Sequence, residues 1–157
     1  MAREIERKFL LKNDHWRAHV VRSDRFVQGY LCTGAEASSS VRVRIGGALA
    51  WLNIKSLSIG IERLEFEYEI PVTDAEDMIA QLCEGPLIEK TRYFVECAGH
   101  HWEIDVFEGE NAGLEVAEIE LTSPQEVVTI PEWIGTEVTN DLRYYNACLV
   151  KKPFKSW

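Results

Sequence analysis

Hydrophobic and polar residues alternate with a period of two through most of this chain, the pattern of strands with two different faces. Segments bounded by Gly, Asn, Asp or Pro predict eight strands, at residues 3–10, 25–32, 40–46, 49–57, 61–72, 87–97, 100–108 and 114–122. Gly46-Gly47 and Ala98-Gly99-His100 are short enough for tight hairpin turns, because glycine tolerates a positive φ. The pattern therefore predicts a mainly β domain with largely antiparallel pairing.

Segments with a helical period interrupt these strands in three places, near residues 13–20, 74–84 and 141–150. In the second, Thr73 or Asp74 can cap the first turn and Gly85-Pro86 can end the helix. Its apolar stripe would cover one face of the sheet, with Ala75, Met78, Ile79, Leu82 and Cys83. Residues 35–40 are small and polar and predict a mobile loop, and the absence of a linker or repeat predicts one domain over 1–157.

The polar phase of the predicted strands carries formal charges at alternate positions. In chain order these are Glu4, Glu6 and Lys8; Arg42 and Arg44; Lys55; Arg63, Glu65, Glu67 and Glu69; Lys90 and Arg92; Glu103 and Asp105; Glu118 and Glu120. A solvated outer face explains any one of these strands, but like charges directly opposed across a ladder cost up to about 1 kcal/mol per pair. A hard divalent cation compensates acid pairs, and a phosphate chain compensates basic pairs.

A closed barrel of about eight strands has an interior wide enough for one small ligand. If the charged faces point inward, the chain forms a tunnel whose walls bind anions and metal ions. The apolar phase, with Ile5, Phe9, Phe66 and Trp102, must then point outward and be covered by helices, loops or a second subunit. A homodimer is one way to supply that cover.

Composition limits the partners of such a tunnel. The 157 residues include 17 Lys and Arg against 26 Asp and Glu, a net charge of −9, which does not favour nucleic acid. The charged first residues do not resemble a secretory signal, and no apolar run approaches the roughly 20 residues of a membrane span. A cytoplasmic protein with no nucleic-acid or membrane partner is expected, and its four cysteines, which lack Cys-x-x-Cys spacing, are expected to be reduced.

The order of the charged motifs resembles that of the CYTH, or triphosphate tunnel metalloenzyme, superfamily. Glu4-Ile5-Glu6-Arg7-Lys8 is similar to its Glu-x-Glu-x-Lys signature, and the later charged pairs follow in the family's order as far as Arg143-Tyr144-Tyr145-Asn146. The resemblance implies a closed eight-stranded antiparallel β-barrel with flanking helices, a lumen that binds a triphosphate and a divalent metal, and a C-terminal helix that plugs one end.

The resemblance also implies roles for individual residues. The phosphate-binding set would be Lys8, Arg42, Arg44, Lys55, Arg63, Lys90, Arg92 and Arg143. The metal-binding set would be Glu4, Glu6, Glu103, Asp105, Glu118 and Glu120, and the catalytic set Glu4, Glu6, Lys8, Glu65 and Glu67. Leu142 stands where some relatives carry lysine in an Asp-Lys-Arg-Tyr segment, so one base of the plug is missing; Arg143 could serve instead, or Arg143, Tyr144 and Asn146 could only pack the helix.

The activity implied is hydrolysis of inorganic tripolyphosphate to diphosphate and phosphate with Mg²⁺ or Mn²⁺. Thiamine triphosphatase and class IV adenylyl cyclase resemble this enzyme in their tunnel and stay open, with Trp51, Tyr30 or Trp102 available to stack on an organic group. A non-catalytic polyphosphate-binding module would gain nothing from acids that face its ligand. A purely structural barrel would lose most of the Coulomb energy of its ion pairs to desolvation.

Overall fold

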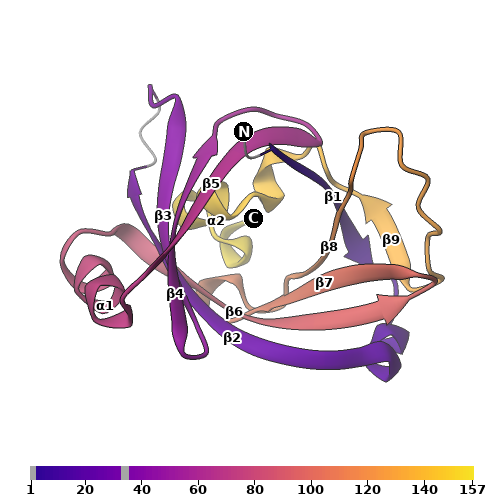
Figure 1. The fold of residues 1–157 in the computed structure, drawn as a ribbon. Helices are drawn as coiled ribbons and strands as arrows, with labels where there is room; N and C mark the ends of the chain where they lie inside the picture. Colours follow the sequence, from indigo (N-terminus) through magenta and orange to yellow (C-terminus); the bar gives the residue numbers. More distant parts are fainter. Residues whose placement is uncertain (1–2, 33–35) are drawn as a thin grey trace.

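The computed structural model describes residues 3–32 and 36–157, and these residues form nine β-strands (Figure 1). The strands are β1 Arg3–Leu11, β2 Val20–Cys32, β3 Ser39–Gly46, β4 Leu49–Ser56, β5 Glu62–Ile70, β6 Glu84–Cys97, β7 His100–Phe107, β8 Glu115–Glu120 and β9 Ile134–Glu137. They pair antiparallel in the order β5-β4-β3-β2-β6-β7-β8-β1-β9, and β1 also pairs with β5. The predicted eight-stranded barrel is confirmed, with β9 as an additional strand.

Strand β1 closes the barrel. It pairs along one edge with β8, and along the other with β5 near its start and β9 near its end. The seam with β5 is short, because only residues 3–5 face residues 62–64 in register. This seam brings the acidic start of β1 against Arg63 at the start of β5.

The helices differ from the prediction in number and at their ends, because short helices at residues 109–111 and 154–156 were not predicted. They are η1 His15–His19, α1 Val72–Gln81, η2 Gly109–Asn111, η3 Leu142–Tyr144, α2 Asn146–Lys151 and η4 Phe154–Ser156. Helix α1 follows Pro71 without a side-chain cap, so the predicted capping by Thr73 or Asp74 is wrong. Gly85-Pro86 lies inside β6 rather than ending the helix, and residue 35 of the predicted loop falls outside the described residues.

The apolar phase of most strands packs on the outside of the barrel, but the predicted cover over Phe66 is wrong for the single chain, because Leu64, Phe66 and Tyr68 of β5 are exposed. Ile5 and Phe9 of β1 and Trp102 of β7 are buried in one cluster, where Trp16 of η1 and Trp133 cover them. The Trp102 ring lies 5.7 Å from Phe9 and 5.5 Å from Trp133, centroid to centroid, in edge-on contacts. A second outer cluster, formed by Val43, Ala50 and Ala75, places α1 against β3 and β4. The charged phase is thereby left to the interior, as predicted.

One end of the barrel is closed by apolar packing. Leu149 and Val150 of α2 are buried against residues of β2, β6, β7 and β8 or of the turn before β8, namely Tyr30, Ile88, Phe107, Val116 and Leu114. Figure 1 views the barrel from the opposite end, with α2 behind the opening. The predicted C-terminal plug is present, although the extended backbone of Tyr145 breaks the predicted helix into η3 and α2.

Candidate functional site

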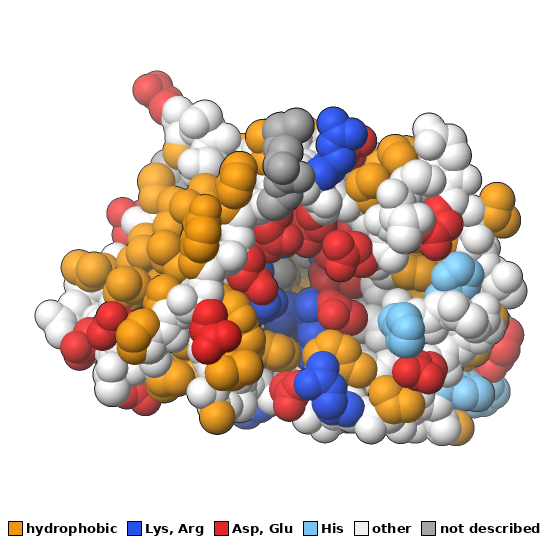
Figure 2. Space-filling model, in the orientation of Figure 1, with side chains coloured by type: hydrophobic (Ala, Val, Ile, Leu, Met, Phe, Trp, Pro, Cys, Tyr) orange, Lys and Arg blue, Asp and Glu red, His pale blue; other side chains and the backbone are white. Residues whose placement is uncertain are grey.

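The barrel encloses a cavity of about 800 Å³. In Figure 2 acidic side chains gather around its mouth and basic side chains lie within. The charged residues of its lining come from β1, β3, β4, β5, β6, β7, β8 and α2: Arg3, Glu4, Glu6, Lys8, Arg42, Arg44, Lys55, Arg63, Glu65, Glu67, Arg92, Glu103, Glu118, Glu120 and Lys151. The alternation of the strands therefore concentrates opposite charges in one partly desolvated space.

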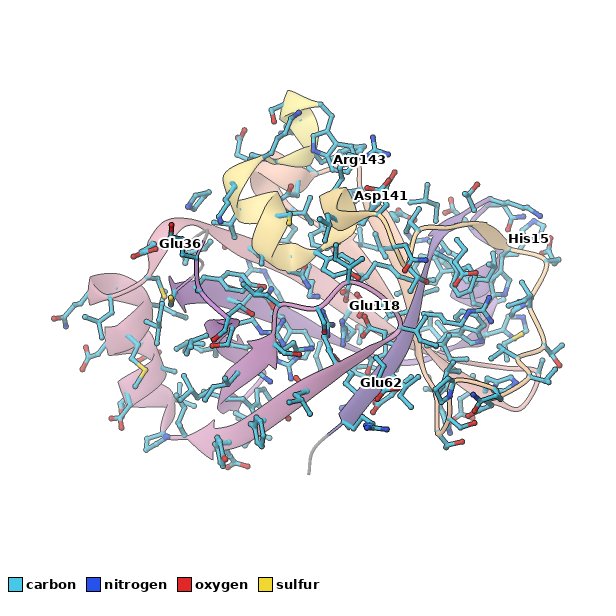
Figure 3. All side chains as sticks on the ribbon, turned by 90° about the horizontal axis from the view of Figure 1, so that it is seen from above. His15, Glu36, Glu62, Glu118, Asp141 and Arg143 are labelled. Carbon is cyan, nitrogen blue, oxygen red and sulfur yellow. The ribbon has the colours of Figure 1, made fainter. Side chains whose placement is uncertain are left out.

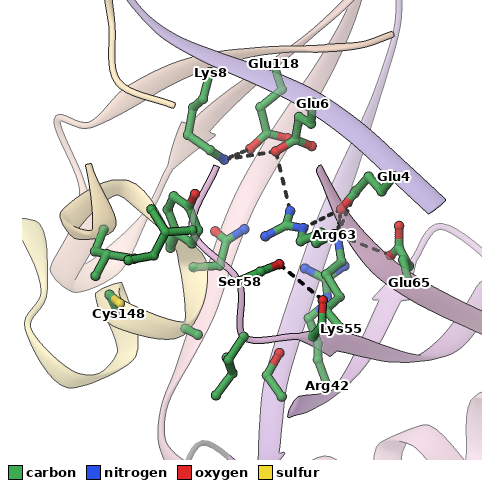
Figure 4. A pocket seen from close by; sticks show the side chains of 18 of the residues that line it. Glu4, Glu6, Lys8, Arg42, Lys55, Ser58, Arg63, Glu65, Glu118 and Cys148 are labelled. Atoms are coloured by element: carbon green, nitrogen blue, oxygen red, sulfur yellow. Dashed lines mark hydrogen bonds and ion pairs between the residues drawn. The ribbon is translucent and has the colours of Figure 1, made fainter. Parts of the chain in front are cut away.

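Strands β1 and β8 hold acids close together on one side of this cavity. The register sets Lys8 opposite Glu118 and Glu6 opposite Glu120. Lys8 Nζ donates to Glu118 and lies 3.5 Å from Glu6 Oε1 (Figure 4). Burial raises the pKa of Glu6, and the neighbouring Glu118 raises it further. Burial also raises the pKa of Glu120, with added repulsion from nearby acids, so this side attracts further positive charge.

Glu4 is compensated where β1 meets β5. Lys55 Nζ lies 2.8 Å from Glu4 Oε1, and Arg63 Nε lies 2.5 Å from Glu4 Oε2 (Figure 4). Lys55 also contacts Glu65 at 3.2 Å, and Arg63 reaches Glu6 at 3.5 Å. Burial alone would raise the pKa of Glu4, but the two cations outweigh it and lower that pKa to about 2. Glu4 is therefore ionised at neutral pH.

Strands β3 and β4 form the basic wall, which we define as Arg42, Arg44 and Lys55. Burial lowers the pKa of Arg44 to about 10, with repulsion from Arg42 and Arg92 contributing. Burial and repulsion from Arg42 and Arg63 lower the pKa of Lys55. Arg44 has one carboxylate partner, Glu67 at 3.0 Å, whereas among the described residues none lies within ion-pair distance of Arg42. The Nε atoms of both arginines are buried without a hydrogen-bond partner, so an anion here would satisfy donors and relieve repulsion.

Arg92 of β6 is held from behind by Asp105 of β7. Arg92 Nε donates to Asp105 Oδ1 at 2.7 Å, and Nη2 donates to Oδ2 at 2.8 Å. The guanidinium also donates to Glu118 Oε2 at 2.8 Å and to Glu103. Lys90 donates to Asp105 as well. These contacts leave Arg92 on the cavity lining but place Asp105 and Lys90 in the wall behind it.

The structure brings most of the predicted site residues together and separates three of them. Lys90 is 1% exposed and Asp105 0% exposed, and neither lines the cavity. Arg143, predicted to bind phosphate from the plug, lies outside the cavity with a side chain that is 60% exposed and bound to Asp141 at 2.6 Å. Figure 3 shows Arg143 beside Asp141 on the outer side of the C-terminal segment. Its predicted place in the tunnel is wrong, because Tyr145 interrupts the helix that would have carried it inward.

Sequence comparison supplies the family. The family model for the CYTH domain matches residues 2–152. The chain belongs to the CYTH family. Two CYTH relatives are named inorganic triphosphatase: one from Acetivibrio thermocellus is 45% identical over 100% of this chain and 99% of its own length, and one from Nitrosomonas europaea is 38% identical over 93% and 95%.

Solved structures agree with this CYTH assignment. A crystal structure of an inorganic triphosphatase superimposes with a TM-score of 0.67 at 35% identity, covering 96% of this chain and 95% of its own. A Pyrococcus horikoshii protein shares the fold alone, with a TM-score of 0.59 at 24% identity over 78% and 80% of the two chains. None of the helices in residues 3–32 and 36–157 has the length and apolar character needed to cross a membrane.

The acids of this CYTH chain fit a divalent cation by their chemistry. Within the described ranges no three carboxylate, imidazole or thiol groups are already gathered for an ion, since the acids are turned toward lysine and arginine. Carboxylate oxygens are nevertheless the ligands that Mg²⁺ and Mn²⁺ prefer. The crowding that raises the pKa values of Glu6 and Glu120 would be relieved by positive charge. The donor set therefore matches such an ion.

Neutral side chains complete the lining of the cavity, and of these the sequence pattern singled out Tyr30 as an aromatic candidate but gave no signal for residues 56–59. Tyr30 and Asn146 line it, as do residues 56–59 between β4 and β5. Tyr145 donates from its hydroxyl to Thr139 O at 2.8 Å, and its ring lies 6.0 Å from Lys8 Nζ. Tyr145 belongs to the Arg143-Tyr144-Tyr145-Asn146 segment, so the motif pointed to the right stretch of chain but to the wrong side chain in it.

Proposed function

We propose that this CYTH chain hydrolyses inorganic tripolyphosphate to diphosphate and phosphate with Mg²⁺ or Mn²⁺. The observation that carries the proposal is the division of one cavity into a basic wall with unsatisfied donors and an opposite side with crowded acids. A small polyanion accompanied by a divalent cation is the kind of ligand that compensates both sides. The names of the two relatives, at 45% and 38% identity, support the same activity.

The basic wall would bind and orient the phosphate chain. Arg42 and Arg44 present guanidinium donors suited to phosphate oxygens, and Lys55 adds a point charge. An anion beside Arg44 would oppose the burial and repulsion that lower its pKa to about 10. Phosphoryl transfer depends mainly on positioning and charge neutralisation, so these residues need form no covalent bond.

Glu6, Glu118 and Glu120 are the residues that would hold the cation, on the side facing the basic wall. When bound, a divalent ion there supplies neutralisation of phosphate charge and a lowered pKa for the attacking water. Lys8 lies between Glu6 and Glu118, and these acids raise its pKa although burial opposes them. Lys8 therefore stays protonated and can stabilise negative charge as the anhydride bond breaks.

The alternatives that need an organic group in the tunnel lose part of their support. Trp102 is buried in the outer cluster and cannot stack on a ligand. Trp51 does not line the cavity, and the centroid of its ring lies 5.1 Å from Arg44 Cζ. Of the three aromatic candidates, Tyr30 lines the cavity. Phosphorus NMR of the products from tripolyphosphate, ATP and thiamine triphosphate tests the proposal, with each metal and with chelator.

Fastest release of phosphate from tripolyphosphate, abolished by chelator, is the expected result. Cyclic AMP from ATP, or turnover that persists with chelator, would contradict it.

Glu6→Gln should lower kcat by about 100-fold or more without unfolding the protein, since it removes one of the acids that would hold the ion. Arg42→Ala should raise KM about tenfold or more, the cost of one charged hydrogen bond, whereas Arg143→Ala outside the cavity serves as its matched arginine control with KM unchanged.

A further inference from the structure

We infer that Lys90 and Asp105 touch neither substrate nor metal and act as positioning residues that hold Arg92 toward the cavity. We call this pair the brace. The inference rests on the proposed function and changes two roles implied by the family resemblance, in which Lys90 binds phosphate and Asp105 binds metal. It follows from where the two side chains lie and from which atoms they already satisfy.

Both oxygens of Asp105 are occupied on the wall side. Oδ1 accepts from Arg92 Nε and Oδ2 accepts from Arg92 Nη2, a two-point contact that fixes the plane of the guanidinium. Oδ2 also accepts from Lys90 Nζ. The residue is 0% exposed and does not line the cavity. A metal ion could reach this carboxylate only by displacing Arg92 or Lys90.

Lys90 is equally removed from the cavity. It lies two residues before Arg92 on β6, opposite Phe107, and its Nζ lies 5.5 Å from the Phe107 ring centroid. Phe107 belongs to the apolar packing that closes the plugged end. The ammonium therefore sits between a sealed apolar layer and Asp105, where it compensates the carboxylate and meets no solvent-filled space.

The brace connects to the cavity through a chain of ion pairs. Arg92 donates to Glu118, and Glu118 accepts from Lys8, so charges alternate from Lys90 to Lys8 across β6, β7, β8 and β1. Arg92 is the member that joins the buried pair to the lining. Without the charge of Asp105, only Glu103 and Glu118 hold the guanidinium, and its orientation is no longer fixed from behind.

Asp105→Asn tests the role of the carboxylate with little change of volume. The informative readout is the affinity for tripolyphosphate measured by calorimetry in chelator, without any divalent ion. A positioning role predicts that this affinity falls about tenfold or more and that KM rises more than kcat falls, as for residues that orient a ligand from behind. The Mg²⁺ concentration needed for half-maximal activity should change less than about twofold, and Asp105→Glu should recover part of the affinity. Unchanged metal-free affinity with a large shift in Mg²⁺ dependence would make Asp105 a metal ligand and overturn the inference.

Lys90→Met, alone and combined with Asp105→Asn, tests the other half of the brace. If Lys90 acts only through Asp105, the double variant should bind tripolyphosphate about as Asp105→Asn does, because the two effects are not additive. A further tenfold loss of metal-free affinity in the double variant would mean that Lys90 contacts phosphate directly, and would contradict the inference. The double variant also removes both charges of the brace. If Asp105→Asn alone does not fold, the metal-free affinity of the double variant is compared with that of the wild type, and an unchanged affinity would contradict the inference.

Glu137→Gln is the matched control, since it breaks the bidentate ion pair with Arg7 outside the cavity and should leave affinity and KM unchanged. Thermal unfolding of every variant separates a loss of Arg92 orientation, which leaves Tm unchanged, from a loss of the fold, which lowers it.

The proposed function and the brace fail in different ways. A wild-type chain that binds tripolyphosphate without hydrolysing it contradicts the proposed function, whereas Asp105→Asn with wild-type metal-free affinity contradicts the brace even if hydrolysis is established.

Discussion

Glu4 lies between two cations, and these contacts decide how its carboxylate titrates. Its pKa in the folded chain is about 2, against an ordinary value of 4.5, because Lys55 and Arg63 outweigh the effect of burial. A lowered pKa stabilises the fold above the ordinary value, and that contribution is lost as pH falls from 4.5 toward 2. A shift of this size corresponds to about 3 kcal/mol.

Glu4→Gln should therefore flatten the acid side of the stability curve. Urea unfolding between pH 7 and pH 3 measures this, and the wild-type chain should lose more stability over that range than the variant. Glu110→Gln, which changes an exposed carboxylate of η2, is the control and should follow the wild-type curve. Parallel curves for Glu4→Gln and wild type would show that the ion pairs at Glu4 do not stabilise the fold.

Period-two alternation was enough to predict which side chains point into the barrel, but not how far into the lumen each one reaches. Lys90 and Arg92 are two residues apart on β6 and share the inward face, yet only Arg92 lines the cavity. The depth of each side chain along the barrel axis depends on its cross-strand neighbour, which is Phe107 for Lys90 and Asp105 for Arg92. Those neighbours follow from the stagger of strands in the closed barrel, which a single strand's pattern does not contain.

The plug helix α2 closes the barrel through a few large apolar contacts. Leu149 is 0% exposed in the cluster with Tyr30 and Phe107. Leu149→Ala should lower the free energy of unfolding by about 2–5 kcal/mol, because it leaves a cavity between α2 and the barrel. Urea unfolding measures the loss, and Val127→Ala at an 89% exposed position should change stability by less than about 0.5 kcal/mol. Similar values for both variants would mean that α2 does not support the barrel.

Strong patterns predicted the long elements well and the short ones poorly. The eight barrel strands were predicted within a few residues, although β2 begins at Val20 rather than residue 25. Strand β9 was missed because Ile-Gly-Thr-Glu is too short for a periodic pattern. Gly135 lies close to β1 there, and a Cβ atom at this position would lie 3.0 Å from Leu10 O, so a side chain would require the two strands to shift apart. That approach is a tertiary event with no local signal.

At the scale of the whole molecule, a net charge of −9 coexists with the basic wall, and acids pair with most of the bases in the cavity. An anion that binds alone along the basic wall meets the free donors of Arg42, but it must compete with Glu67 for Arg44 and with Glu4 and Glu65 for Lys55, and it leaves those acids uncompensated. A cation that binds alone leaves the bases uncompensated. Each ligand should therefore favour binding of the other.

Thermal unfolding can measure this coupling. With Mg²⁺ and a non-hydrolysable imidotriphosphate together, the rise in Tm should exceed the sum of the rises with each alone, since both bind the folded chain. Glu6→Gln should reduce the excess by removing one of the displaced acids. Strictly additive shifts would contradict the coupling.

The homodimer expected from the sequence stays a prediction. Leu64, Phe66 and Tyr68 of β5 are exposed in the single chain and form the apolar surface that a second subunit would cover.

The three-residue seam between β1 and β5 should be the part of the barrel that is most sensitive to heat. It is formed by the first described residues of the chain, and Glu4 and Arg63 face each other within it. A seam this short should open locally on warming, before the rest of the barrel unfolds. Each opening would separate Glu4 from Arg63 and open the wall of the cavity that the charged side chains line, so activity should be lost at a temperature below that of global unfolding.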